Sequence, residues 1–175
     1  AVEAPFWESR GGEGWAPREA GAEAALQAFI DNVWHGYAQG RDLPGQRLTS
    51  RLSPYLHFGH IAPWRVMDAL GDHAPGEREA FVRELGWRDF AHHVLHHFTH
   101  TPQENFNRRF DDFPWRAPAA DELAAWQQGR TGVPIIDAGM RELWATGWMH
   151  NRVRMIVASF LTKNLRLHWR HGARW

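Results

Sequence analysis

Apolar side chains recur every three or four residues along most of this chain, which is the spacing of one face of an α-helix. Gly40, Gly71, Gly129 and Gly147 follow such segments closely, as glycines that end helices do. No segment alternates between apolar and polar residues as a strand does. We therefore expect an all-α domain with irregular connections. The predicted helices cover residues 19–37, 63–70, 77–98, 119–128 and 134–146, and the stretch 141–165 is expected to be a core helix as well.

The stretch 141–165 combines a buried stripe with a cluster of polar residues. The stripe consists of Val153, Ile156, Val157, Phe160 and Leu161. Asn151, Arg152, Arg154 and Met155 lie mostly off this stripe, in the first turns of a helix, where carboxylates are normally favoured over cations. This unusual placement of two arginines predicts an anionic ligand near the start of the helix.

The longest predicted helix, 77–98, has two faces that differ in character. Its apolar stripe consists of Phe81, Leu85, Phe90, Val94, Leu95 and Phe98. Glu84, Trp87 and Arg88 share a second face because they are three and four residues apart. This second face is either a surface ion pair between Glu84 and Arg88 beside a half-buried Trp87, or a ligand-binding face.

The histidines of HHVLHH, residues 92–97, could ligate a metal in pairs four residues apart. No third ligand is apparent and the chain has no HExxH pattern, so we predict no metal site.

The loop TSRLS at 49–53 precedes Pro54 and has the composition of a phosphate-binding segment. We expect Ser53 at the N-cap of a short helix and Pro54 at its first position. Hydroxyl groups, backbone N–H groups and Arg51 would then surround one helix N-terminus, which favours an anion. The alternative is an ordinary helix cap with a surface arginine.

Composition excludes several kinds of site. The chain of 175 residues is 43% hydrophobic with no net charge and no cysteine, which rules out disulfides, thiolate zinc sites and a thiol nucleophile. No apolar run is long enough to span a membrane and the N-terminus does not resemble a signal peptide, so we expect a soluble, cytoplasmic protein. Residues 1–18 have the composition of a linker. The C-terminal third is basic, as a solvated helix face or a phosphate-binding surface would be. Most of the eleven tryptophans are expected in the core.

Four motifs together resemble the photolyase and cryptochrome flavoproteins, over residues 15–175. They are TSRLSPYLHFG at 49–59, ELGWRDF at 84–90, WQQGRTGVPIIDA at 126–138 and TGWMHNRVRMIVASFLTKNL at 146–165. The resemblance implies that residues 19–175 are part of a helical FAD-binding domain. It also implies that the family's sequence continues beyond Trp175, and that an antenna chromophore belongs to an N-terminal domain of the intact parent.

The resemblance assigns roles to individual residues. Those matching the family's FAD-binding positions are Tyr37, Thr49, Ser50, Arg51, Leu52, Ser53, Phe81, Arg88, Trp148, Asn151 and Arg154. Those matching positions that contact DNA or a flipped-out lesion are Arg41, Glu84, Trp87, Asn151, Arg152 and Met155. Those matching catalytic positions are Glu84 and Asn151 at the lesion, and Trp115 and Trp169 in a tryptophan chain that reduces the flavin.

The implied function is light-driven repair of cyclobutane pyrimidine dimers in damaged DNA, with reduced FAD as electron donor and with a class I photolyase as the nearest type. Asn151 separates the chain from (6-4) photolyases, which carry histidine there. We expect a monomer. Two alternatives are a cryptochrome-type photoreceptor acting through a protein partner, and a helical nucleic-acid-binding module without a cofactor.

Overall fold

The computed structural model describes residues 15–72 and 74–175, which divide into two compact units. One unit is Trp15–Thr99, and the described part of the other runs from His100 to Trp175. Within the described residues the regular structure is helical, apart from one isolated parallel bridge between Arg116 and Leu167. The all-α prediction is confirmed. The predicted linker at 1–18 lies mostly outside the described residues.

The first unit contains four α-helices around a long fifth. Its elements are α1 (Arg18–Asn32), η2 (Trp34–Gly36), α2 (Tyr37–Gly40), α3 (Ser53–His57), α4 (Pro63–Leu70) and α5 (Pro75–His97). The single helix predicted at 19–37 is wrong, because the chain leaves the α-conformation at Val33 and makes a 3₁₀ turn. That turn sets the rings of Trp34 and Tyr37 against Phe29, at 5.8 and 5.5 Å between centroids.

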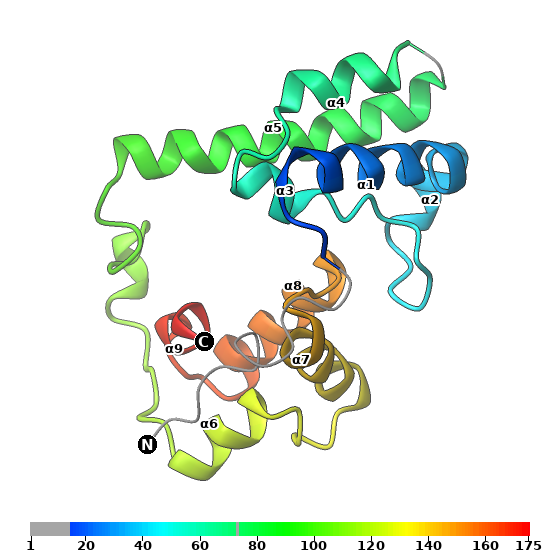
Figure 1. Ribbon diagram of the computed structural model, residues 1–175. Helices are drawn as coiled ribbons and strands as arrows, with labels where there is room; N and C mark the ends of the chain where they lie inside the picture. The colour runs from blue at the N-terminus through cyan, green and yellow to red at the C-terminus, as the bar shows by residue number, and fades with distance from the viewer. Residues whose placement is uncertain (1–14, 73) are drawn as a thin grey trace. The chain divides into compact units, whose positions relative to one another are not determined.

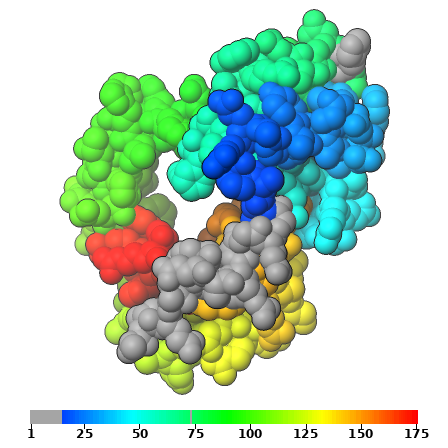
Figure 2. Space-filling model, viewed as in Figure 1, coloured from blue at the N-terminus to red at the C-terminus, as the bar shows by residue number. Residues whose placement is uncertain are grey.

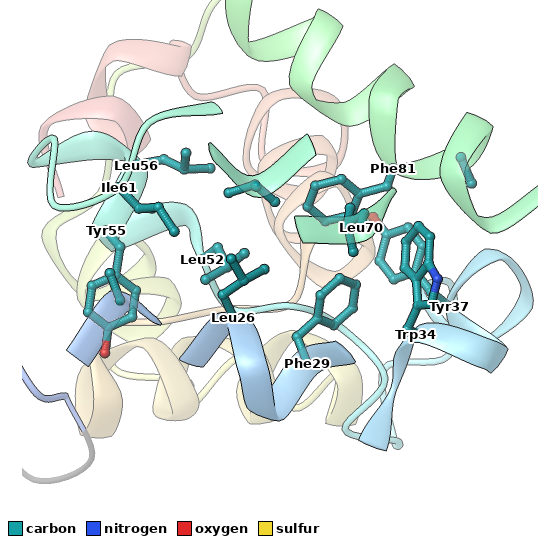
Figure 3. Packing of buried hydrophobic residues seen from close by; sticks show 13 residues of the cluster. Leu26, Phe29, Trp34, Tyr37, Leu52, Tyr55, Leu56, Ile61, Leu70 and Phe81 are labelled. Atoms are coloured by element: carbon teal, nitrogen blue, oxygen red, sulfur yellow. The ribbon is translucent and has the colours of Figure 1, made fainter. Parts of the chain in front are cut away.

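The core of this unit is divided between aliphatic and aromatic residues. Figure 3 shows the rings of Phe29, Trp34, Tyr37 and Phe81 gathered at one end of the cluster, with Leu26 and other aliphatic side chains beside them. Phe81 from α5 lies 5.4 Å from both Phe29 and Tyr37. Burial of such large side chains is the main stabilising contribution to the unit.

Helix α5 is buried mainly along its first half. Helices α2 and α4 pack against it, and α4 runs beside its N-terminal part (Figure 1). Phe81 is buried and Leu85 and Val94 are partly buried, whereas Phe90, Leu95 and Phe98 are exposed, so the predicted stripe is wrong in its C-terminal half. In Figure 2 the atoms of this half stand apart from those of α1 and α2.

The second unit is built on the pair α7 and α8. Its elements are η3 (Arg108–Phe110), α6 (Ala120–Gln127), α7 (Pro134–Thr146), α8 (Asn151–Ser159), the π-helical turn η4 (Phe160–Asn164) and α9 (Trp169–Arg174). The prediction for 134–146 is confirmed, with Gly147 left-handed at φ 70°. The stretch 141–165 is not one continuous helix, because α7 ends before α8 begins. Helix α9 was not predicted.

Close approach of α7 and α8 depends on Gly139. A Cβ added there would lie 2.2 Å from Cγ1 of Val153, so only glycine fits. Val153, Val157 and Leu161 are buried between these helices as the stripe predicts, while Ile156 is exposed. The indole N–H of Trp126 on α6 donates to the Val157 carbonyl at 3.2 Å, which joins a third helix to the pair.

The tryptophans are less buried than expected. Trp34 and Trp126 are buried, but Trp64, Trp87, Trp144 and Trp175 are exposed. In the described part of the chain, no helix has the length and apolar character required to cross a membrane.

Candidate functional site

The first unit has a cavity of about 530 Å³ that several predicted site residues line. Tyr37 comes from α2, Ser50 and Ser53 from the loop and start of α3, and Phe81 and Arg88 from α5. Glu84 also lines the cavity, together with Pro54, Leu56, His57, Leu85 and His92. The geometry therefore combines an aromatic wall with hydroxyl groups, a guanidinium and a carboxylate.

Glu84 pairs with Arg41 and not with Arg88. Nη1 of Arg41 lies 2.6 Å from Oε1 of Glu84, and the two side chains are 16% and 33% exposed. The Arg41 guanidinium also lies 5.7 Å from the ring centroid of Tyr37. Burial raises the pKa of Tyr37 to about 12, with Glu84 and Asp42 adding to the rise and Arg41 opposing it. Tyr37 is thus a neutral hydroxyl at physiological pH.

Arg88 is fixed by the backbone of α3. Its Nη2 donates to the carbonyl of Leu56 at 3.2 Å, which holds the guanidinium at the cavity wall. Nδ1 of His92 lies 2.8 Å from the Arg88 carbonyl, one turn further along α5. His92 was not predicted as a site residue, although its spacing of four residues from Arg88 and eight from Glu84 places it on the same face.

The TSRLS loop contributes less to the cavity than its sequence suggests. Ser53 does not cap α3: the helix begins at Ser53, Leu52 occupies the N-cap, and no side chain caps the end. Ser50 instead accepts the N–H of Leu52 at 3.4 Å. Leu52 is a core residue, and the Arg51 guanidinium lies 5.2 Å from the Trp15 ring. Thr49, Arg51 and Leu52 are therefore absent from the cavity lining.

Trp87 presents a flat exposed ring outside the cavity. It is 59% exposed on α5, and its ring meets Phe90 edge-on at 5.9 Å. An exposed indole of this kind is available to stack on another planar group.

In the second unit, the start of α8 groups three predicted residues. Asn151, Arg152 and Met155 are exposed, and Nδ2 of Asn151 lies 4.0 Å from the Met155 sulfur. His150 caps the helix, since its Nδ1 accepts the Arg152 N–H at 3.2 Å, and its side chain is only 1% exposed. Sequence reasoning missed this cap, because histidine is an uncommon N-cap residue.

Two further predicted residues of this stretch are Arg154 and Trp148. Arg154 lines a second cavity of about 450 Å³, whose walls are mainly apolar and include Trp126, Met149 and Trp169. The Trp148 side chain is partly buried, and its backbone N–H donates to Oγ1 of Thr146 at 3.1 Å.

The imidazole of His168 contacts both predicted redox tryptophans. The ring of His168 is 5.0 Å from Trp115 and 5.4 Å from Trp169, between centroids. The indole N–H of Trp169 donates to Oδ1 of Asn105 at 2.7 Å, and that of Trp115 donates to the Phe110 carbonyl at 3.1 Å. Neither His168 nor Asn105 was predicted.

Three histidine rings of α5 are neighbours, and those of His96 and His97 are 4.9 Å apart between centroids. The rings of His93 and His97 are 4.3 Å apart, between centroids. Across residues 15–72 and 74–175, no three histidine, aspartate or glutamate side chains gather as metal ligands do.

The chain is similar in sequence to photolyases and cryptochromes. Residues 81–175 match the family model for the FAD binding domain of DNA photolyase. The chain is 46% identical over 175 residues to a deoxyribodipyrimidine photo-lyase of Agrobacterium fabrum, covering 98% of this chain and 36% of that protein. It is 41% identical over 172 residues to Cryptochrome-1 of Sinapis alba, covering 92% of this chain and 34% of that protein.

Solved structures show the same relationship. A bacterial class III photolyase from Agrobacterium tumefaciens superposes with a TM-score of 0.88 at 45% identity, over 98% of this chain and 36% of that one. An archaeal photolyase from Sulfolobus tokodaii, solved with two FAD molecules, gives 0.75 at 38% identity, over 86% of this chain and 33% of that one. The chain thus spans about a third of the length of these relatives. Its assignment to class I stays a prediction.

Proposed function

Because the chain belongs to the DNA photolyase and cryptochrome family, and its residues 81–175 match that family's FAD-binding domain, we propose that it supplies flavin-binding and DNA-binding residues of a deoxyribodipyrimidine photolyase. The observation that carries the proposal is the cavity lined by Tyr37, Ser50, Ser53, Phe81 and Arg88. Hydroxyl groups and a guanidinium match the oxygens of the FAD diphosphate, while aromatic walls match its planar rings. The residues present therefore fit this cofactor.

Each side chain has a distinct part in this proposal. Ser50, Ser53 and Arg88 donate hydrogen bonds to phosphate oxygens. Tyr37 stays protonated and can donate as well, given its raised pKa. Reduced FAD, when bound, supplies under light the electron that opens a cyclobutane pyrimidine dimer.

A different set of residues is proposed to bind the DNA lesion. Photolyases act on a base that has left the stack, which requires a flat surface and a hydrogen-bonding group for the flipped base. Trp87 offers an exposed indole plane, and Glu84 offers carboxylate oxygens as hydrogen-bond acceptors. On α8, Asn151 and Met155 are proposed to contact the lesion, and Asn151 also the flavin. Arg152 and Arg41 add positive charge for the DNA backbone.

Further residues are proposed to contact the flavin or to carry electrons to it. We propose that Arg154 and Trp148 also contact the flavin, and that Thr49, Arg51 and Leu52 contribute backbone groups. Trp115 and Trp169 are proposed to carry electrons toward it. An antenna chromophore would belong to a further domain of a longer parent.

The direct test is blue-light repair of an oligonucleotide containing one pyrimidine dimer, by protein reconstituted with FAD. We expect repair that requires light and bound flavin. A protein that binds FAD yet leaves the dimer intact would favour a cryptochrome-type photoreceptor. The 41% identity to Cryptochrome-1 of Sinapis alba supports the photoreceptor as the second candidate function.

Flavin retention tests the role of Arg88. We expect Arg88→Met to weaken FAD binding roughly tenfold, since a charge-assisted hydrogen bond is lost. The measurement is flavin absorbance retained after gel filtration. Arg83→Met is the matched control, because Arg83 lies on the same helix and pairs with Glu79 at the surface. Equal retention in both variants would exclude Arg88 from the flavin site.

Binding of damaged DNA tests the role of Trp87. We expect Trp87→Ala to weaken binding of dimer-containing DNA roughly tenfold by loss of base stacking, with a much smaller effect on undamaged DNA. Trp64→Ala is the control, because Trp64 is an exposed tryptophan of the same unit. A loss of the same size on both DNAs would contradict a lesion-specific role.

A further inference from the structure

A hydrogen-bonded relay connects a carboxylate to the indole of Trp169. The Trp169 N–H donates to Oδ1 of Asn105 at 2.7 Å, and Nδ2 of Asn105 donates to Oδ1 of Asp111 at 2.8 Å. Asn105 is buried, with 9% of its surface exposed, and it is separated from Trp169 by 64 residues of sequence. A buried amide that joins a charge to an aromatic N–H is a specific arrangement, because each of its groups needs a partner.

We propose that Asp111, acting through Asn105, stabilises the oxidised form of Trp169, and that Asn105 is thereby a positioning residue for electron transfer through this tryptophan. The proposal rests on the electron-carrying role of Trp115 and Trp169 in the proposed function. Neither the sequence motifs nor the family match assigns a role to Asn105 or Asp111.

The negative charge of Asp111 favours the oxidised, positively charged form of Trp169. The Asp111 carboxylate polarises the Asn105 amide, which makes Oδ1 a stronger acceptor for the indole N–H. When Trp169 loses an electron, the ring becomes positive and this acceptor stabilises it. Arg108 lies 3.4 Å from the other oxygen of Asp111, near the surface, and offsets part of the carboxylate charge.

The same geometry determines where the proton goes. One electron leaves the Trp169 ring for a one-electron oxidant, such as a photoexcited flavin. The amide oxygen of Asn105 is not a base at neutral pH, so the N–H proton stays on the oxidised indole. An electron from Trp115 then restores Trp169 and leaves Trp115 oxidised.

His168 keeps the path between the two indoles free of added positive charge. Its ring contacts both indoles, and its Nδ1 accepts the Arg170 N–H at 3.2 Å. Burial lowers the pKa of His168, as do Arg170 and His171, while Asp111 opposes them. The imidazole is therefore neutral at neutral pH and does not repel an oxidised neighbour.

The test removes the charge and keeps the geometry. Asp111→Asn retains a hydrogen-bond acceptor for Asn105, and Asp112→Asn removes the same charge from the adjacent residue. The chain is illuminated with soluble riboflavin in air, and oxidation at each tryptophan is measured by peptide mass spectrometry. This assay uses neither bound FAD nor DNA, so a failure of flavin binding or repair would leave it interpretable.

We expect Asp111→Asn to lower oxidation at Trp169 roughly fivefold relative to exposed Trp64, as loss of one partly screened charge predicts. Asp112→Asn should leave the ratio within about a factor of two, and Asp111→Glu should restore it, because it keeps the charge. An unchanged ratio in Asp111→Asn would overturn the proposal. An equal loss in Asp112→Asn would overturn it too, since a general change of net charge would then be the cause.

Discussion

At the residue scale, the buried carboxylate of Asp137 explains why the TG-x-P-x-x-D motif has its spacing. Asp137 accepts the Thr131 N–H at 2.7 Å, the Thr131 hydroxyl at 2.6 Å and the Gly132 N–H at 2.9 Å. These bonds fold the turn back onto the first turn of α7. We expect Asp137→Asn to lower the free energy of unfolding by about 2 kcal/mol, because the amide group places N–H against N–H. Denaturant unfolding would measure the loss.

The effect of Asp137 depends on pH in a defined direction. Burial alone raises the pKa of this carboxyl, but the hydrogen bonds from Thr131 and Gly132 lower it in the folded protein. A lowered folded pKa means that the stabilisation is present above the unfolded pKa of about 3.9 and is lost as the pH falls through the folded value. The difference between wild type and Asp137→Asn should shrink below about pH 4. A difference that stays constant down to pH 2 or so would contradict the role of the charge.

The sequence predicts which residues lie near the cavity better than it predicts which side chains they contact. The motif TSRLS indicates a ligand-facing loop, yet Leu52 belongs to the core and the Arg51 guanidinium lies over Trp15. The partner of Glu84 could not be predicted either, since Arg88 is four residues away on the same helix and Arg41 is on another element. Helical spacing reports neighbours along one helix, whereas partners on other elements depend on tertiary packing.

At the element scale, the contact of α7 with α8 depends on Gly139. We expect Gly139→Ala to destabilise the protein by about 1–3 kcal/mol, because the added methyl group would overlap Val153. Thermal unfolding would measure this. The matched control is Gly86→Ala on α5, where a Cβ would meet no atom within 4 Å. That change should stabilise by about 0.5–1 kcal/mol, because alanine favours helix. Equal effects at both positions would show that propensity, not packing, dominates.

Elements with strong periodicity and glycine stops are those that the sequence predicts well. Helices α4 and α7 match their predicted bounds, and α5 and α6 differ by at most two residues at an end. The break after α1 was missed because Trp34 and Tyr37 continue the helical spacing while packing in a 3₁₀ turn. The π-helical turn at Phe160–Asn164 was missed for the same reason. In each case tertiary packing overrides local spacing.

At the scale of the whole molecule, each unit has its own hydrophobic cluster. Leu26 is fully buried in the first and Met140 in the second. We expect Leu26→Ala and Met140→Ala each to destabilise by about 2–5 kcal/mol. Hydrogen exchange should show lost protection in Trp15–Thr99 for the first variant and in α7 and α8 for the second. Uniform loss over the whole chain from either variant would contradict two separate cores.

The ion pair between Arg41 and Glu84 limits which bases the proposed site accepts. The carboxylate oxygens of Glu84, one of which contacts Arg41, accept hydrogen bonds and do not donate them. Any base edge that meets Glu84 must therefore present an N–H group, as N3 of thymine does. A methyl group on that nitrogen would remove the N–H donor, so the flipped base could not form a hydrogen bond to the carboxylate. If Glu84 contacts the lesion as proposed, this site would select for bases that carry an N–H group on the edge facing it.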